Sequence, residues 1–342
     1  MLVLAASKAC SQTYTFSPLD HPSGVNGTAA QGIFSNKVVG VYYDSNVVSH
    51  GFVYDGTNYQ TIDPPGSQLT NLRGIYGNRL VGYFANALGT HGFMFDGTNY
   101  TTLDDPHATA GTHGTYAYGI NSNNKIAGYY VSNNIPHGFT FDGTNYVTLD
   151  YPTGTFGTYV QGIYGTNIVG LGYDIALGSG HSFLYNGSSF TTLSNSVGAV
   201  DAFGISANGT IVGYSYDGTT DHGFVYSGTN YATIDYPLST LTAIYGIDGN
   251  NIVGLYYDNL SHAHGFMGRA VIARPTLTIT RGTGVVLLQW PTNATGFGLQ
   301  FTTNLPANSW SNLNVIPTTT NTNYLVTFPL DSTNRFFRLH NP

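Results

Sequence analysis

The chain has 342 residues, of which 41% are hydrophobic, 14% aromatic and only 8% charged. It contains 17 Asp and no Glu, and because the polar helix formers are nearly missing while Tyr, Thr, Val and Ile abound, an α-rich or α/β enzyme and a disordered chain are both disfavoured. The net charge is −7 and no basic run exists, so no nucleic-acid partner is expected.

The N-terminal segment 1–12 has the composition of an incomplete secretory signal. Met1–Ala6 is apolar, but this run is shorter than the roughly 7–15 residues of a signal's hydrophobic region. We therefore expect 1–12 to be a signal-peptide remnant or disordered, and the protein to be secreted or located at the cell surface. Cys10 is the single cysteine, which excludes an internal disulfide, and no apolar run has the roughly 18 residues of a transmembrane segment.

The next part of the chain, 13–270, is an internal repeat. A Gly-Ile pair recurs six times, from Gly32-Ile33 to Gly246-Ile247, at spacings of 42, 45, 43, 42 and 42 residues. Each pair is followed by an apolar run, by His-Gly-Phe or a variant of it, by a turn such as Asp-Gly-Thr-Asn and by a short strand that usually ends in Asp. The turn residues favour hairpins. Each unit therefore predicts four antiparallel strands, which is the period of a propeller blade.

The last unit lacks its fourth strand. No Tyr-x-Thr-Ile-Asp segment follows Phe266-Met267, whereas a strand of similar character, Tyr14–Asp20, precedes the first unit. An N-terminal strand that completes the last blade would close the ring and cover its edges. The sequence thus predicts an all-β protein with a six-bladed β-propeller closed by an N-terminal strand.

The repeat stops after Arg274-Pro275. Residues 276–342 contain short alternating strands separated by Gly, Asn and Pro, a pattern that predicts a small β-sandwich. Trp290 and Trp310, the only two tryptophans, are expected in its core.

Both parts of the chain resemble known families. The repeat pattern Gly-Ile…Ile-Val-Gly-x-Tyr…His-Gly-Phe-x-Tyr-Asp-Gly resembles the HAF-type repeats of bacterial extracellular proteins, over about three quarters of the chain. The tail, with Trp290-Pro291, Thr303-Asn304-Leu305 and Phe336-Phe337-Arg338-Leu339, is similar to the fibronectin-III-like modules of secreted bacterial proteins. The resemblance implies an extracellular setting and an attachment role for the tail, and it supplies no catalytic residues.

The repeated histidines and the Asp residues that end the outer strands are interpreted as structural. A residue that recurs in every blade is expected to have a structural role that all blades share. Equivalent residues around a ring also lie too far apart to share a metal ion, whose bonds are about 2 Å long. We expect each His to make a hydrogen bond at the start of the third strand, and each Asp to accept from backbone N–H groups. No metal site and no cofactor are predicted.

A functional site is expected where the blades differ. The segment from the outer-strand Asp to the next Gly-Ile is longest at Asp104–Tyr118, and the residues that precede each Gly-Ile are expected to approach the central channel. The loop contributes the ligand-binding candidates Asp105, His107, His113, Tyr116 and Tyr118. The channel contributes Gln31, Arg73, Gln161 and Tyr245.

Aromatic rings together with Asp and amide side chains suit sugars, which present apolar faces and many hydroxyls. The first hypothesis is therefore a monomeric, secreted or cell-surface propeller that binds extracellular carbohydrate or another surface ligand, without enzymatic activity. The alternative is a polysaccharide-cleaving enzyme, either a lyase or an Asp/His-dependent glycoside hydrolase, with His107, His113, Arg73 and Tyr118 as catalytic candidates. A third hypothesis is a purely structural surface protein.

Overall fold

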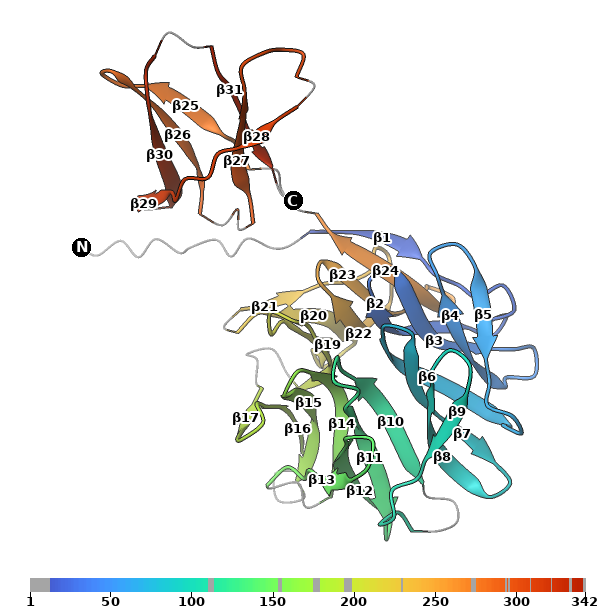
Figure 1. The fold of residues 1–342 in the computed structure, drawn as a ribbon. Coiled ribbons are helices and arrows are strands. Elements are labelled where there is room, and N and C mark those ends of the chain that lie inside the picture. Colours follow the sequence, from blue (N-terminus) through green and yellow to red (C-terminus); the bar gives the residue numbers. More distant parts are fainter. Residues whose placement is uncertain are drawn as a thin grey trace. The chain divides into compact units, whose positions relative to one another are not determined.

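The computed structural model describes residues 13–342 except 110–113, 153–155, 175–178, 194–198, 229, 272–274, 293, 295, 308, 321, 332–333 and 341–342. The described residues are all-β, with strands in four-stranded and three-stranded antiparallel sheets (Figure 1). Two compact units divide after Val271. The expected signal remnant, 1–12, lies outside the described residues.

The first unit contains six four-stranded sheets among its described residues, and each follows one sequence repeat. Strand order within a sheet is sequential except in the last sheet, where the order is β22, β23, β24 and then β1. The strands of the first three sheets are β2 (Thr28–Phe34), β3 (Lys37–Tyr43), β4 (Ser49–Tyr54), β5 (Tyr59–Ile62), β6 (Leu69–Tyr76), β7 (Arg79–Asn86), β8 (Gly89–Phe95), β9 (Tyr100–Leu103), β10 (Thr115–Ile120), β11 (Ile126–Ser132), β12 (Ile135–Phe141) and β13 (Tyr146–Thr148). Those of the other three are β14 (Gly157–Tyr164), β15 (Asn167–Asp174), β16 (Ser179–Tyr185), β17 (Phe190–Thr192), β18 (Ala199–Ile205), β19 (Ile211–Tyr216), β20 (Asp221–Tyr226), β21 (Tyr231–Thr233), β22 (Leu241–Asp248), β23 (Asn251–Tyr257), β24 (Ala263–Ala270) and β1 (Tyr14–Pro18).

The first strand of each sheet contacts the first strand of the next, in the order β2, β6, β10, β14, β18, β22 and back to β2. The glycines of the Gly-Ile pairs allow this close approach. A Cβ atom on Gly74 would lie 2.5 Å from the carbonyl oxygen of Tyr118, and one on Gly246 would lie 3.1 Å from the Cα of Gly32. A side chain at these positions would push neighbouring strands apart, so the repeated glycine is required by packing between sheets.

Each of these first strands also carries a bulge. The pairing with the second strand skips one residue immediately before the glycine in all six sheets. A bulge leaves its extra residue unpaired and redirects the side chain. The skipped residues are Gln31, Arg73, Tyr118, Gln161, Phe203 and Tyr245.

The core of each sheet is built around the phenylalanine of the His-Gly-Phe motif. Six such rings are at most 2% exposed: Phe52, Phe93, Phe139, Phe183, Phe224 and Phe266. Burying a phenylalanine side chain stabilises a fold by roughly 1.5–3 kcal/mol, so these rings anchor every repeat in the same way.

In the sixth sheet, β1 pairs antiparallel with β24, with Tyr14 opposite Ala270 and Pro18 opposite Phe266 (Figure 1). Phe16 of β1 packs edge-on against the rings of Tyr236 and Phe266, at centroid distances of 5.3 and 5.6 Å. The N-terminal strand thereby contributes apolar contacts as well as backbone hydrogen bonds to a sheet whose other three strands come from the last repeat.

The second unit has two small antiparallel sheets among its described residues. Leu288, Trp290 and Leu299 form the centre of its buried core. Trp310 differs from the prediction, because it is half-buried and its ring lies under the Arg338 guanidinium at 4.4 Å instead of in the core. The strands are β25 (Thr278–Arg281), β26 (Val285–Pro291), β30 (Asn323–Pro329) and β29 (Thr318–Thr320) in one sheet, and β28 (Ser311–Asn312), β27 (Gly298–Thr302) and β31 (Phe336–His340) in the other.

Candidate functional site

The bulged residues converge, so the structure brings together much of the channel set predicted from the sequence. Arg73 Nη1 donates to Gln31 Oε1 at 2.8 Å, and its guanidinium lies 4.8 Å from the centre of the Tyr118 ring. Across the ring, Tyr245 packs edge-on against Phe203 at 5.1 Å. The bulged residues therefore include two contacting pairs, Arg73 with Tyr118 and Phe203 with Tyr245.

Arg73 is held in place by uncharged partners. Besides Gln31 it donates to the Tyr83 hydroxyl at 3.2 Å, while its buried Nε atom has no partner among the described residues. A guanidinium on aromatic faces gains cation–π attraction, which is worth more where water is excluded. The described partners of Arg73 are therefore the Gln31 amide oxygen, the Tyr83 hydroxyl and the rings of Tyr83 and Tyr118.

Tyrosines dominate the neighbouring part of the channel. Tyr116 stacks on Tyr129 with ring centres 4.5 Å apart, and Tyr129 also contacts Tyr118 and Tyr159. Burial raises the pKa of both Tyr118 and Tyr129, so their hydroxyls stay protonated near neutral pH and can both donate and accept hydrogen bonds.

This cluster borders a pocket of about 380 Å³. The pocket is lined by residues of the first and second strands of three consecutive sheets, β10–β11, β14–β15 and β18–β19. Five of the ten lining residues are tyrosines, and the others include two polar groups, Gln161 and Asp201. The Oε1 atom of Gln161 is buried and accepts no hydrogen bond from the described residues. An amide oxygen without a donor is costly to bury, so a bound donor group at this position would be stabilised.

Asp201 is the carboxyl group of the pocket. Burial raises its pKa, a hydrogen bond from Tyr214 opposes this, and the negative charge of Asp221 raises the pKa further. Burial also raises the pKa of Asp221. The pocket therefore holds a carboxyl group that is easier to protonate than an ordinary aspartate.

Further lining residues were not predicted from the sequence, among them Asp201, Tyr129, Tyr159 and Tyr214. A signal for them exists, because Tyr159 and Asp201 precede a bulged residue by two positions, whereas Tyr129 and Tyr214 follow the glycine of the second strand. Side chains two positions apart in a strand share a face. The sequence alone did not reveal that the side chains at these positions line a common pocket.

The long loop is divided: Tyr118 lines the pocket and Tyr116 stacks on Tyr129, whereas Asp105 and His107 contact other residues. The backbone N–H and Nδ1 of His107 both lie 2.9 Å from Asp105 Oδ1, and the ring of His107 faces Tyr130. Asp105 is 3% exposed and its N–H donates to the Thr115 hydroxyl. The described contacts of His107 thus do not include Arg73 or the pocket, because Asp105 folds the loop back on its own blade. His113 lies outside the described residues.

The repeated histidines make hydrogen bonds within their own blades. Nδ1 of His50, His137 and His222 lies 2.7–2.8 Å from the Asp that follows the outer strand. In the first repeat the same Asp63 also accepts from the N–H of Gly51. These pairs tie the outer strand to the start of the third strand, a structural use for both residue types.

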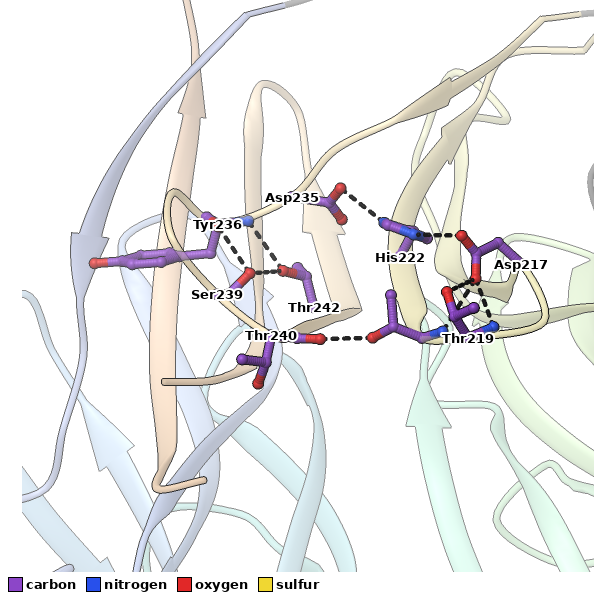
Figure 2. A network of polar contacts seen from close by, with 9 residues as sticks. Asp217, Thr219, His222, Asp235, Tyr236, Ser239, Thr240 and Thr242 are labelled. Atoms are coloured by element: carbon purple, nitrogen blue, oxygen red, sulfur yellow. Dashed lines mark hydrogen bonds and ion pairs between the residues drawn. The ribbon is translucent and has the colours of Figure 1, made fainter. Parts of the chain in front are cut away.

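In three repeats of the described part of the chain, the other ring nitrogen faces a second carboxylate. Figure 2 shows His222 between Asp235 and Asp217, with Nε2 3.2 Å from Asp217 Oδ2. The corresponding distances are 3.7 Å between His50 and Asp44 and 3.5 Å between His264 and Asp258. The hydrogen bonds to Asp235 and Asp217 raise the pKa of His222.

Among the described residues, one set has the composition of a metal centre. Asp258, His262 and His264 each offer a ligand atom, and these atoms lie within 4.8 Å of one another. No metal site was expected from the sequence, because equivalent histidines of different repeats were expected to lie too far apart to share an ion. His262 and His264 belong instead to the same repeat.

No family model matches the sequence, and no curated protein matches it. Among solved structures, the chain is similar to the β-propeller domain of the Trilobed protease from Pyrococcus furiosus, at 10% identity and a TM-score of 0.45, covering 72% of this chain and 98% of that one. A puromycin-hydrolyzing peptidase from Mycobacterium tuberculosis has 9% identity and a TM-score of 0.45, covering 79% of this chain, which spans only 58% of the peptidase. The six-bladed fucose-recognising lectin from Aleuria aurantia has 12% identity and a TM-score of 0.43, covering 86% of this chain and 97% of the lectin.

At these identities and TM-scores the matches carry no information about ligand or reaction. Within the part of the chain that the structure describes, no helix has the length and apolar character required to cross a membrane.

Proposed function

We propose that the protein is a carbohydrate-binding β-propeller whose site is the tyrosine-lined pocket at the channel. The observation that carries the proposal is the unsatisfied Gln161 amide oxygen in a pocket of about 380 Å³ that is otherwise lined mainly by aromatic rings. Aromatic faces pack on sugar rings, while an amide and a carboxyl group bond to hydroxyls. The volume of the pocket lies within the range of roughly 300–1,000 Å³ that is typical of small-ligand sites.

The architecture in this proposal is a closed ring of six blades, with β1 as the closing strand. It is supported by the pairing of β1 with β24 and by the cyclic contacts of the first strands. The proposal extends to a HAF-type repeat, a fibronectin-III-like second unit and a secreted or cell-surface, monomeric protein. The low charge and the Asn-, Thr- and Gly-rich sequence support the extracellular setting.

The test is a glycan array probed with the full chain, followed by titration of the best ligand. Gln161→Met keeps the side-chain volume and removes the amide, so binding should fall at least tenfold while the melting temperature stays the same. His107→Ala is the matched control outside the pocket and should bind as the wild type does. Absence of any glycan binding, or equal binding by Gln161→Met, would contradict the proposal and favour a purely structural surface protein.

A polysaccharide-cleaving enzyme is the second candidate, and the raised pKa of Asp201 favours it. A carboxyl group that retains its proton closer to neutral pH can act as a general acid on a glycosidic oxygen. A reducing-end assay on the glycans that bind would detect this activity, and Asp201→Asn should abolish it without abolishing binding. If no reducing ends form, the binding function stands alone.

A further inference from the structure

We propose that Asp258, His262 and His264 form a binding site for a divalent transition-metal ion of the Zn²⁺ type. The site lies in the turn between β23 and β24 and at the start of β24, away from the tyrosine-lined pocket. It does not depend on the proposed carbohydrate function. Two imidazoles and one carboxylate are a ligand set that zinc accepts in open, three-ligand sites.

Two of the three separations between ligand atoms match tetrahedral coordination, and the third is at most 4.8 Å. Asp258 Oδ2 lies 3.3 Å from His262 Nδ1 and 3.5 Å from His264 Nε2. Bonds of about 2.0–2.1 Å at tetrahedral angles place neighbouring ligand atoms roughly 3.3–3.5 Å apart. An ion could therefore bind with small side-chain adjustments.

The surrounding hydrogen bonds orient the ligands. Asp258 Oδ1 accepts from the N–H groups of Leu260 and His262, which leaves Oδ2 as the atom that faces the histidines. His264 Nδ1 lies 2.9 Å from Asp20 Oδ2, so its Nε2 is the free ligand atom. A carboxylate on the far nitrogen of a ligating histidine is the usual support of a metal-bound imidazole.

The site is open to ligand entry. His262, His264 and Asp20 line a groove of about 610 Å³, which the loop residues Gly24 to Gly27 also border. The His262 side chain is 67% exposed, so it can adjust to an ion at little cost. Three protein ligands would leave at least one coordination position facing this groove.

The first repeat provides a natural comparison. Its turn has the same length between Asp44 and His50 and the same backbone hydrogen bonds, with Val48 in the place of His262. Val47 and Ser261 have matching φ angles of 62° and 64°. His262 is therefore a ligand added to a turn whose backbone does not require it.

The experiment is calorimetric titration of the full, metal-free chain with Zn²⁺, without an affinity tag that contains histidine. We expect one ion per chain, and at least a tenfold weaker affinity in His262→Val. This variant carries the residue found in the first repeat, so it should fold, and its melting temperature without metal should equal that of the wild type. Zn²⁺ should raise the melting temperature of the wild type and leave that of the variant nearly unchanged.

His107→Ala is the matched control, because His107 is another exposed histidine beside an aspartate. It should bind Zn²⁺ as the wild type does. The proposal is overturned if the wild type binds Zn²⁺ no more tightly than His262→Val, or if His107→Ala weakens binding by the same factor. A spectrum of bound Co²⁺ without tetrahedral character would overturn the stated coordination.

Discussion

At the scale of single residues, the protein uses the same residue types in two different ways. Most aspartates accept hydrogen bonds that their blade supplies, as Asp63 does from His50 and Gly51. Asp201 instead has its charged form disfavoured by burial. The distinction matters because a carboxylate stabilised by the fold is a structural element, whereas one destabilised by the fold is available for chemistry or ligand binding.

Replacing Asp201 by Asn should stabilise the protein near neutral pH. The folded state raises the pKa of Asp201, so its favourable contribution exists below the ordinary Asp pKa and is lost as the pH rises through the folded pKa. Asn retains the shape and carries no charge. Urea unfolding should show that the free energy of unfolding of the variant exceeds that of the wild type by about 1 kcal/mol at pH 7. This difference should become smaller as the pH is lowered. A constant difference at all pH values would contradict the assigned cause.

His222→Ala should destabilise the protein more in acid than in base. The hydrogen bond to Asp235 is the largest cause of the raised pKa of His222, so its stabilisation is present below the unfolded pKa of His and is lost as the pH rises through the folded pKa. We expect the substitution to lower the free energy of unfolding by roughly 1–2 kcal/mol at pH 5.5 and by less at pH 8.5. In the background of Asp235→Asn, most of this pH dependence should disappear, and its persistence there would assign it to another group.

At the scale of elements, the first strand of each sheet combines a bulge with a glycine. The glycine allows adjacent first strands to approach closely, and the bulge leaves the residue before the glycine unpaired. The sequence repeat predicts that these side chains approach a central channel, and in the structure Arg73 contacts Gln31 and Tyr118. It could not predict that Arg73 and Gln31 bond to each other, because that depends on the register between two blades 42 residues apart.

Gly74→Ala should lower the free energy of unfolding by about 1–3 kcal/mol, the usual cost of overpacking. The added methyl would lie 2.5 Å from the Tyr118 carbonyl oxygen and 2.9 Å from Val81 Cγ2, and backbone cannot yield as a flexible side chain does. Gly77→Asn is the control, since Gly77 has a φ of 62° that Asn tolerates and a Cβ there meets nothing within 4 Å. Equal melting temperatures of both variants would contradict the packing argument.

Deleting residues 1–21 should destabilise the first unit and cause association. Without β1 the backbone edge of β24 is unpaired and Phe266 loses the ring of Phe16. An exposed strand edge is a site of intermolecular pairing. Calorimetry should show a lower melting temperature, and size-exclusion chromatography should show species larger than the monomer. If the truncated chain has the same melting temperature as the full protein and stays monomeric, the sixth sheet does not need this strand.

At the scale of the whole molecule, regular features were predictable and individual contacts were not. Periodicity located the repeated four-stranded units and the end of the repeat near Arg274, because spacing and turn residues are local properties of the chain. The pocket was located only in part, since Asp201 and Tyr214 acquire their roles from burial and from each other. Loop length was a poor guide to His107, whose position is decided by the hydrogen bonds of Asp105.

The two units should unfold in separate transitions. Both tryptophans, Trp290 and Trp310, lie in the second unit, so tryptophan fluorescence reports on that unit alone. Tyrosine fluorescence and far-UV circular dichroism report mainly on the first unit, which holds most of the tyrosines and strands. Because the units have separate cores, the urea midpoint measured by tryptophan fluorescence should differ from the midpoint measured by tyrosine fluorescence and circular dichroism. A chain ending at residue 275 should keep the unfolding transition of the first unit and the ligand affinity of the full chain. Coincident transitions in the full chain, together with failure of the 1–275 chain to fold, would mean that the two units form one cooperative structure.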